Sequence, residues 1–308
     1  MVDAIRYRGP AVGTTYAPAR DESIELPDGR TLAYTEWGDL DGRPVFSFHG
    51  MPGSRLFVPD PEAARDEHVR LIAPDRPGMG GSDPQPGHVV ADWPADVVTL
   101  ADTLGLDTFG VFGWSAGTPY AFACAALIPE RSIAVAATTS AAAMRYLIHD
   151  DPDFRESILD DEDRQIFDAL PQGREAAERL AAELAAGFIE WLTEHPEELV
   201  EHESDPGDEG FLADPSQRQA FIDSIREAVR QGAEAFAPAY VAQIAPWGFR
   251  LEDIAIPVHV WAGANDRITP PERMQLVADK IPNVEFTLWD DAGHAGIDKH
   301  FRDVLREL

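Results

Sequence analysis

The stretch Gly113-Trp114-Ser115-Ala116-Gly117 decides the fold of this chain. An apolar, strand-like run that begins at Thr108 leads into it, and a helix-like run that reaches Ile128 follows it. A G-x-S-x-G sequence at a strand-to-helix turn is typical of a nucleophile elbow, which holds a serine hydroxyl exposed above a sheet. The two glycines favour this interpretation, because a side chain two residues from the serine would collide with neighbouring backbone.

Apolar runs alternate with helical patterns on both sides of this stretch. N-terminal to the first of these runs, residues 23–37 predict a hairpin with its turn at Asp28-Gly29. The alternation predicts an α/β fold with a mostly parallel, doubly wound sheet. The predicted strands are 45–48, 71–73, 109–112, 133–137, 258–262 and 284–289, and the predicted helices are 61–68, 92–104, 116–128, 271–281 and 298–305.

The alternation stops near Ser140 and resumes at Pro257, and only helical patterns lie between. Residues 175–192 and 221–229 carry apolar stripes at helical spacing, whereas the acidic, Gly- and Pro-containing residues 194–214 predict a flexible loop. An all-helical insert before the last two strands predicts a cap over the carboxyl edge of the sheet, where such folds bind ligands. We therefore expect a core domain (21–140 and 245–308), a helical cap (141–244) and an N-terminal arm (1–20).

The composition narrows the class of protein. The 308 residues are 44% hydrophobic, which supports a substantial core. No run of 18 apolar residues occurs, and the first six residues lack the apolar stretch of a signal peptide, so we expect a cytoplasmic protein. The single cysteine, Cys124, excludes an internal disulfide bond and is expected to be a small core residue.

The chain is strongly acidic, with 55 acidic and 25 basic residues and a net charge of -30. Such a surface repels phosphates, which argues against nucleic acid and membrane partners. Two explanations of the acidity stay open: adaptation to high salt, or the bias of a GC-rich genome. We expect a small-molecule substrate and neither a metal nor another cofactor, and a homo-oligomer is compatible with the sequence.

A serine hydroxyl becomes a good nucleophile only when a base takes its proton and an acid orients that base. After G-x-S-x-G, the partners follow in the order Asp or Glu, then His. Asp266 and His294 each come just after a predicted strand and therefore lie at the same sheet edge as Ser115. His300 is the other histidine after Asp266, but it falls on the last predicted helix. The predicted catalytic residues are Ser115, Asp266 and His294.

An oxyanion formed at Ser115 needs two N–H donors. The sequence predicts these as the backbone N–H groups of Ala116, directly after the nucleophile, and of Met51, in the loop after strand 45–48. Gly50 allows the loop to approach closely. We also predict substrate contacts for Gly50, Met51 and Trp114, and for Trp247, which is placed to close the pocket.

Together these motifs resemble the α/β-hydrolase fold superfamily, and most closely its capped, esterase-like serine hydrolases. The resemblance covers nearly the whole chain after residue 20. It implies Ser115 as nucleophile, His294 as base, Asp266 as orienting acid and a helical cap that contributes the pocket. The motifs that carry it are His49-Gly50-Met51-Pro52-Gly53, Asp75-Arg76-Pro77-Gly78, Gly113 to Gly117, Gly263 to Asp266 and Gly293-His294.

Departures from related patterns narrow the chemistry. Haloalkane dehalogenases and epoxide hydrolases place an aspartate where this chain has Ser115. Proline iminopeptidases resemble Gly-Gly-Ser-Trp-Gly at the elbow, and hydroxynitrile lyases use a lysine near the triad, whereas no lysine precedes Lys280 here. Meta-cleavage C–C hydrolases share the serine triad but usually continue differently from Met51-Pro52-Gly53.

The leading hypothesis is a carboxylesterase that cleaves a small to medium, mainly apolar ester through an acyl-enzyme intermediate. The same triad would also serve a C–C bond hydrolase of a dienone-type substrate. The alternative from another class is a non-catalytic ligand-binding member of the fold.

Overall fold

The computed structural model of the chain describes residues 16–202 and 205–308. Its centre is an eight-stranded sheet with the strand order β1-β2-β4-β3-β5-β6-β7-β8. The N-terminal arm predicted for residues 1–20 lies largely outside the described residues. The strands are β1 (Arg20–Glu25), β2 (Thr31–Gly38), β3 (Arg43–Phe48), β4 (Val69–Pro74), β5 (Phe109–Gly113), β6 (Ser132–Thr138), β7 (Val258–Gly263) and β8 (Val284–Trp289).

The sheet is mostly parallel, which confirms the predicted fold class. β1 and β2 form the predicted antiparallel hairpin, and β2 also pairs antiparallel with β4. Every pairing from β4 to β8 is parallel. All five residues of β5 are buried, as expected for a central strand that is covered on both faces. Ser115 therefore follows a strand in the middle of the sheet.

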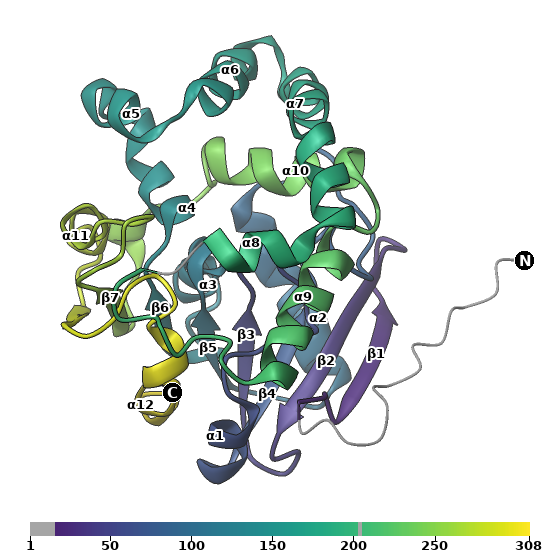
Figure 1. The fold of residues 1–308 in the computed structure, drawn as a ribbon, viewed down its shortest axis with the longest axis vertical. Coiled ribbons are helices and arrows are strands. Elements are labelled where there is room, and N and C mark those ends of the chain that lie inside the picture. Colours follow the sequence, from purple (N-terminus) through teal and green to yellow (C-terminus); the bar gives the residue numbers. More distant parts are fainter. Residues whose placement is uncertain (1–15, 203–204) are drawn as a thin grey trace, which may run out of the picture.

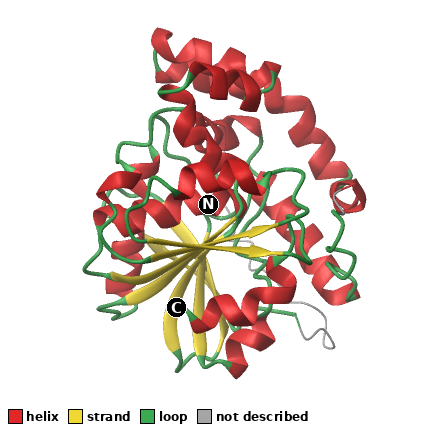
Figure 2. Cartoon of the chain, turned by 90° about the vertical axis from the view of Figure 1, so that its left-hand side faces the viewer, coloured by secondary structure: helices red, strands yellow, loops and turns green. Residues whose placement is uncertain are grey.

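Helices cover both faces of the twisted sheet (Figure 2). α2 (Trp93–Thr103), α3 (Thr118–Leu127) and α11 (Pro271–Ala278) contribute buried side chains to one core cluster. α1 (Pro61–Asp66) and α12 (Ile297–Arg306) contribute to the second cluster, on the other face. This doubly wound arrangement leaves the carboxyl ends of the parallel strands open for a site.

Residues 141–244, which we call the helical insert, lie between β6 and β7 in the chain. All regular elements that are described in this insert are helical. Figure 1 shows α5, α6, α7 and α10 above the ends of the central strands. The helices are α4 (Ala141–Met144), α5 (Pro152–Ile158), α6 (Asp161–Ala169), α7 (Arg174–Glu194), α8 (Pro196–His202), α9 (Pro215–Val229) and α10 (Ala233–Ile244), with 3₁₀ turns η3 (Arg145–His149) and η4 (Leu170–Gln172).

The prediction of a continuous loop over residues 194–214 is wrong in its first part, because α8 begins at Pro196. Proline suits the first position of a helix, and the acidic residues Glu197 and Glu198 in the first turn favour its N-terminal dipole. The composition that indicated a loop therefore also starts a helix. None of the helices among the described residues combines the length and apolarity that crossing a membrane requires.

Candidate active site

The turn after β5 holds Ser115 in a strained backbone conformation, with φ at 49°. A Cβ atom added at Gly117 would lie 2.1 Å from the carbonyl oxygen of Phe48 in β3. A Cβ atom added at Gly113 would lie 2.8 Å from the carbonyl oxygen of Gly117. Both glycines are thus required by close backbone approach, as the G-x-S-x-G pattern predicts.

Ser115, His294 and Asp266 come together in one hydrogen-bonded chain. The Ser115 Oγ atom lies 3.1 Å from His294 Nε2, and His294 Nδ1 lies 2.9 Å from Asp266 Oδ2. A carboxylate only accepts hydrogen bonds, so Nδ1 carries the proton and the Nε2 lone pair faces the serine hydroxyl. This is the arrangement in which an imidazole can remove the proton of a serine.

Asp266 is fixed in turn by the loop that follows β7. Its Oδ1 atom accepts the backbone N–H groups of Ile268 and Thr269, at 2.9 and 2.7 Å. Its side chain is fully buried. His300, the competing histidine, lies on α12 and faces Asp291 Oδ1 at 2.9 Å instead.

Two insert residues that the sequence analysis missed hold the loop of His294. Asp208 accepts the N–H groups of Gly293 and Ala295, each at 2.8 Å, through its two carboxylate oxygens. Asp205 accepts the N–H of His294 itself at 3.2 Å. Burial raises the pKa of Asp208. The segment predicted as a loop thus fixes the backbone of the candidate base.

The backbone N–H groups of Met51 and Ala116 donate to no acceptor among the described residues, as an oxyanion hole requires. Buried Arg76 holds the loop before Met51: its guanidinium donates to the carbonyl oxygen of Gly50 at 3.0 Å and also to that of His49. His49 Nδ1 lies 2.8 Å from the same Gly50 oxygen. Burial lowers the pKa of His49 well below its usual value, so this ring is neutral and structural.

A cavity of about 460 Å³ reaches Ser115 and His294 from the side of the helical insert. The sheet edge contributes Met51 and Ala116 to its lining. The insert contributes an apolar wall, made of Ile166, Ala181, Leu184, Ala185, Phe188 and Phe236, and a polar group, made of Arg145, Glu162, Tyr240 and Gln243.

A second, smaller cavity of about 70 Å³ also reaches Ser115 and His294, and it includes Gly50. Its aromatic wall is formed by Phe57, Trp114 and Phe221. The Trp114 ring centroid lies 5.9 Å from that of Phe57 and 6.2 Å from that of Phe221. Trp114 is therefore placed beside the candidate nucleophile, but only in the smaller cavity.

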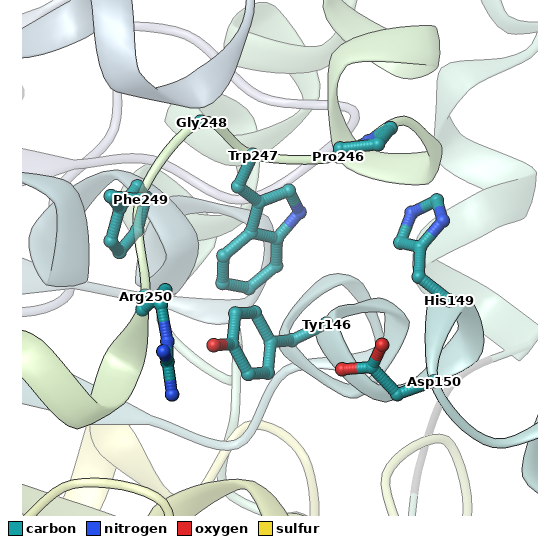
Figure 3. A pocket seen from close by; sticks show the side chains of 8 residues that line it. All are labelled: Tyr146, His149, Asp150, Pro246, Trp247, Gly248, Phe249 and Arg250. Carbon is teal, nitrogen blue, oxygen red and sulfur yellow. The ribbon is translucent and has the colours of Figure 1, made fainter.

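Trp247, predicted to contact the substrate, lines neither of these two cavities among the described residues. Its indole N–H donates to the carbonyl oxygen of Gln243 at 3.1 Å, one turn back at the end of α10. Its ring packs on Tyr146, with 5.2 Å between centroids, and lines a separate pocket that includes Arg250 (Figure 3). The Trp247 indole therefore lies in the lining of this separate pocket, and its contact with the substrate stays a prediction.

The described residues contain no group of three or more His, Cys, Asp or Glu side chains that could hold a metal ion. Cys124 is buried on α3, and burial raises the pKa of its thiol. Its position agrees with the predicted core role.

Comparison with known proteins places this geometry in context. The family model for the alpha/beta hydrolase fold matches residues 43–301 of this chain. A non-heme chloroperoxidase from Streptomyces lividans is 36% identical over 97 residues, 31% of this chain and 35% of that protein. A proline iminopeptidase from Xanthomonas citri is 32% identical over 112 residues, 35% of this chain and 36% of that protein. These curated relatives are thus matched over about a third of their length.

Solved structures match over much more of the chain. A thermophilic esterase from Thermogutta terrifontis has a TM-score of 0.65 and 26% sequence identity, covering 94% of this chain and 97% of that one. A bromoperoxidase from Bacillus anthracis has a TM-score of 0.66 at 21% identity, covering 93% and 98%. The second likeness shows a common fold.

Proposed function

This chain belongs to the alpha/beta hydrolase fold family, and we propose that it is a serine hydrolase that cleaves a carboxylic ester through an acyl-enzyme intermediate. The observation that carries the proposal is the chain of hydrogen-bond distances from Ser115 Oγ through His294 to Asp266. The likeness to an esterase structure supports the same reaction class.

The proposed reaction has two balanced steps. Ser115 Oγ forms a bond to the ester carbonyl carbon while its proton passes to His294 Nε2, and the alcohol then leaves with that proton. Water next gives a proton to His294 and attacks the acyl carbon, which releases the carboxylic acid and restores the serine hydroxyl. The N–H groups of Met51 and Ala116 stabilise the negative oxygen of each tetrahedral intermediate.

The two cavities support a small to medium ester with a short group on one side of its carbonyl. The smaller cavity has a volume of about 70 Å³, against about 460 Å³ for the larger one, so it takes the shorter group of the ester. The larger cavity takes the rest of the substrate against the apolar wall of the helical insert.

We assign this insert, residues 141–244, the role of a cap domain on the core of residues 21–140 and 245–308.

The test is Ser115→Ala, which leaves the other groups of the site in place. We expect hydrolysis of p-nitrophenyl acetate and butyrate to fall at least about a thousandfold, because the acyl-enzyme has no oxygen to form on. Ser157→Ala, which alters an exposed serine on α5, is the matched control and keeps wild-type rates. Unchanged turnover in Ser115→Ala overturns the assignment.

A C–C bond hydrolase with the same three residues is the second candidate. Both reactions begin with the same proton transfer from Ser115 to His294, so the geometry of these side chains supports either. A panel of short acyl esters set against a dienone-type ring-cleavage product separates them. Faster turnover of the dienone identifies the C–C hydrolase, and faster turnover of the esters identifies the esterase.

A further inference from the structure

A polar cluster lies in the otherwise apolar insert side of the larger cavity. Arg145 of η3 donates through Nη2 to Asp163 Oδ2 of α6 at 2.6 Å and to the Tyr240 hydroxyl of α10 at 2.9 Å. That hydroxyl donates to the other oxygen of Asp163 at 2.6 Å. Asp163 and Tyr240 therefore fix the guanidinium in place, and the Asp163 carboxylate balances its charge.

Two donors beside this cluster have only long contacts. The nearest acceptor of Arg145 Nη1 is Gln243 Oε1, at 3.5 Å. Gln243 Nε2 lies 3.5 Å from the Met51 sulfur and 3.5 Å from the carbonyl oxygen of Ala239. A distance of 3.5 Å to an oxygen is at the outer limit of a hydrogen bond, and thioether sulfur is a weak acceptor.

Gln243 is buried, with 1% of its surface exposed, and the Arg145 side chain is 12% exposed. The Tyr120 hydroxyl lies near the same amide and has no hydrogen bond of good geometry among the described residues. A buried donor without a full-strength partner is costly. Both Arg145 and Gln243 line the cavity that contains Ser115, so an oxygen of a bound substrate is the partner that this surface lacks.

We infer that Arg145 and Gln243 form a subsite for a neutral hydrogen-bond acceptor, such as a ketone or amide carbonyl, in the part of the substrate that fills the larger cavity. The acceptor is neutral because Asp163 already balances Arg145 and because Glu162 adds a negative charge to the same lining. Gln243 reaches the Met51 side chain, so the subsite and the oxyanion donors serve one molecule. This inference rests on the proposed ester hydrolysis.

The probes are two series of medium-length esters. In methyl esters of straight-chain acids and in acetates of straight-chain alcohols, one methylene is replaced by C=O at each successive position that at least two methylenes separate from the ester group, because a nearer carbonyl activates the ester itself. We expect one position in one series to raise kcat/KM about 10- to 100-fold over the matched all-methylene ester, as for a hydrogen bond to a charged donor. Equal values at every position in both series overturn the subsite.

Gln243→Leu removes the amide donors while keeping a similar volume. We expect the ratio of kcat/KM between the best oxo ester and its methylene partner to fall several-fold, because the Arg145 donor stays in place. Gln165→Leu, which makes the same change at an exposed glutamine of α6 that does not line the cavity, keeps the wild-type ratio. An unchanged ratio in Gln243→Leu overturns the role of this residue.

The two proposals fail in distinguishable ways. Wild-type protein that cleaves plain esters but shows no oxo preference contradicts the subsite and leaves the esterase proposal standing. Wild-type protein that cleaves no ester of either series contradicts both. Thermal unfolding temperatures close to that of the wild-type protein show that the variants are folded.

Discussion

The sheet edge and the helical insert build the same site in different ways. The sheet edge supplies the proposed reacting groups, and hydrogen-bonded loops hold them: Asp266 accepts two backbone N–H groups, and Arg76 fixes the loop before Met51. The insert mainly supplies cavity walls, such as Leu184 and Phe188. Rate and substrate choice are therefore expected to be separable by substitution.

The largest effect is expected at the sheet edge, from Asp266→Asn. An amide at this position can donate toward His294 Nδ1 and so favours the tautomer that has its proton on Nε2, where it no longer accepts the serine proton. We expect kcat to fall about 10,000-fold for every ester, with little change in the ranking of substrates. Steady-state kinetics over several acyl lengths measures this.

Asp303→Asn, which changes an exposed carboxylate on α12, is the control for that prediction and keeps wild-type kinetics. A loss of rate in Asp266→Asn for some esters only would contradict the separation of rate from substrate choice.

A smaller effect is expected from Asp208, the insert residue that fixes the loop of His294. Asp208→Asn leaves one oxygen for two N–H groups, because the amide nitrogen is itself a donor. The loop of His294 is then less well fixed, and we expect kcat to fall about 10- to 100-fold with KM nearly unchanged. Kinetics and thermal unfolding are measured together.

The matched variant is Asp214→Asn, which alters another insert aspartate that accepts two backbone N–H groups, at the start of α9. It is expected to keep both the stability and the kcat of the wild-type protein, because asparagine caps a helix about as well as aspartate. Should Asp208→Asn lose stability without losing kcat, Asp208 has a structural role and does not position His294.

The smallest effects concern the aromatic walls of the two cavities. Phe221 lines only the smaller cavity, and Phe188 lines only the larger one. Phe221→Ala is expected to raise, several-fold, the relative kcat/KM of esters in which the group that fills the smaller cavity is lengthened. Phe188→Ala is expected to change the preference for the group that fills the larger cavity. Equal shifts in both variants would show that the cavities are not used separately.

The same two regions differ in how well the sequence predicts them. Gly113 and Gly117 are needed at a turn of fixed geometry, so a local sequence pattern predicts the turn of Ser115. Asp266 and His294 each follow a strand, so the topology of the sheet predicts that they lie at the same edge. The insert has no such pattern. Asp205 and Asp208 lie in an acidic segment that also suits a solvated loop, and only the fold brings them to the backbone near His294.

Trp247 shows the same limit at a single residue. Its position after α10 is compatible with an aromatic group that closes the pocket, and its apolar ring fits plain packing equally well. The structure adds a hydrogen bond from the indole N–H to the carbonyl oxygen of Gln243. That bond depends on the turn at the end of α10, which the sequence pattern does not predict.

The division into core and cap domains remains a prediction that truncation or limited proteolysis can test.

The most direct test of the account is covalent labelling of the intact protein by a fluorophosphonate, followed by mass spectrometry. The wild-type protein is predicted to gain the mass of one phosphonyl group, mapped to Ser115, and Ser115→Ala to gain none. His294→Ala is predicted to react far more slowly, since the hydroxyl then has no base at 3.1 Å. Wild-type protein that stays unlabelled, or label that persists in Ser115→Ala, would contradict the assignment of Ser115 as a nucleophile activated by His294.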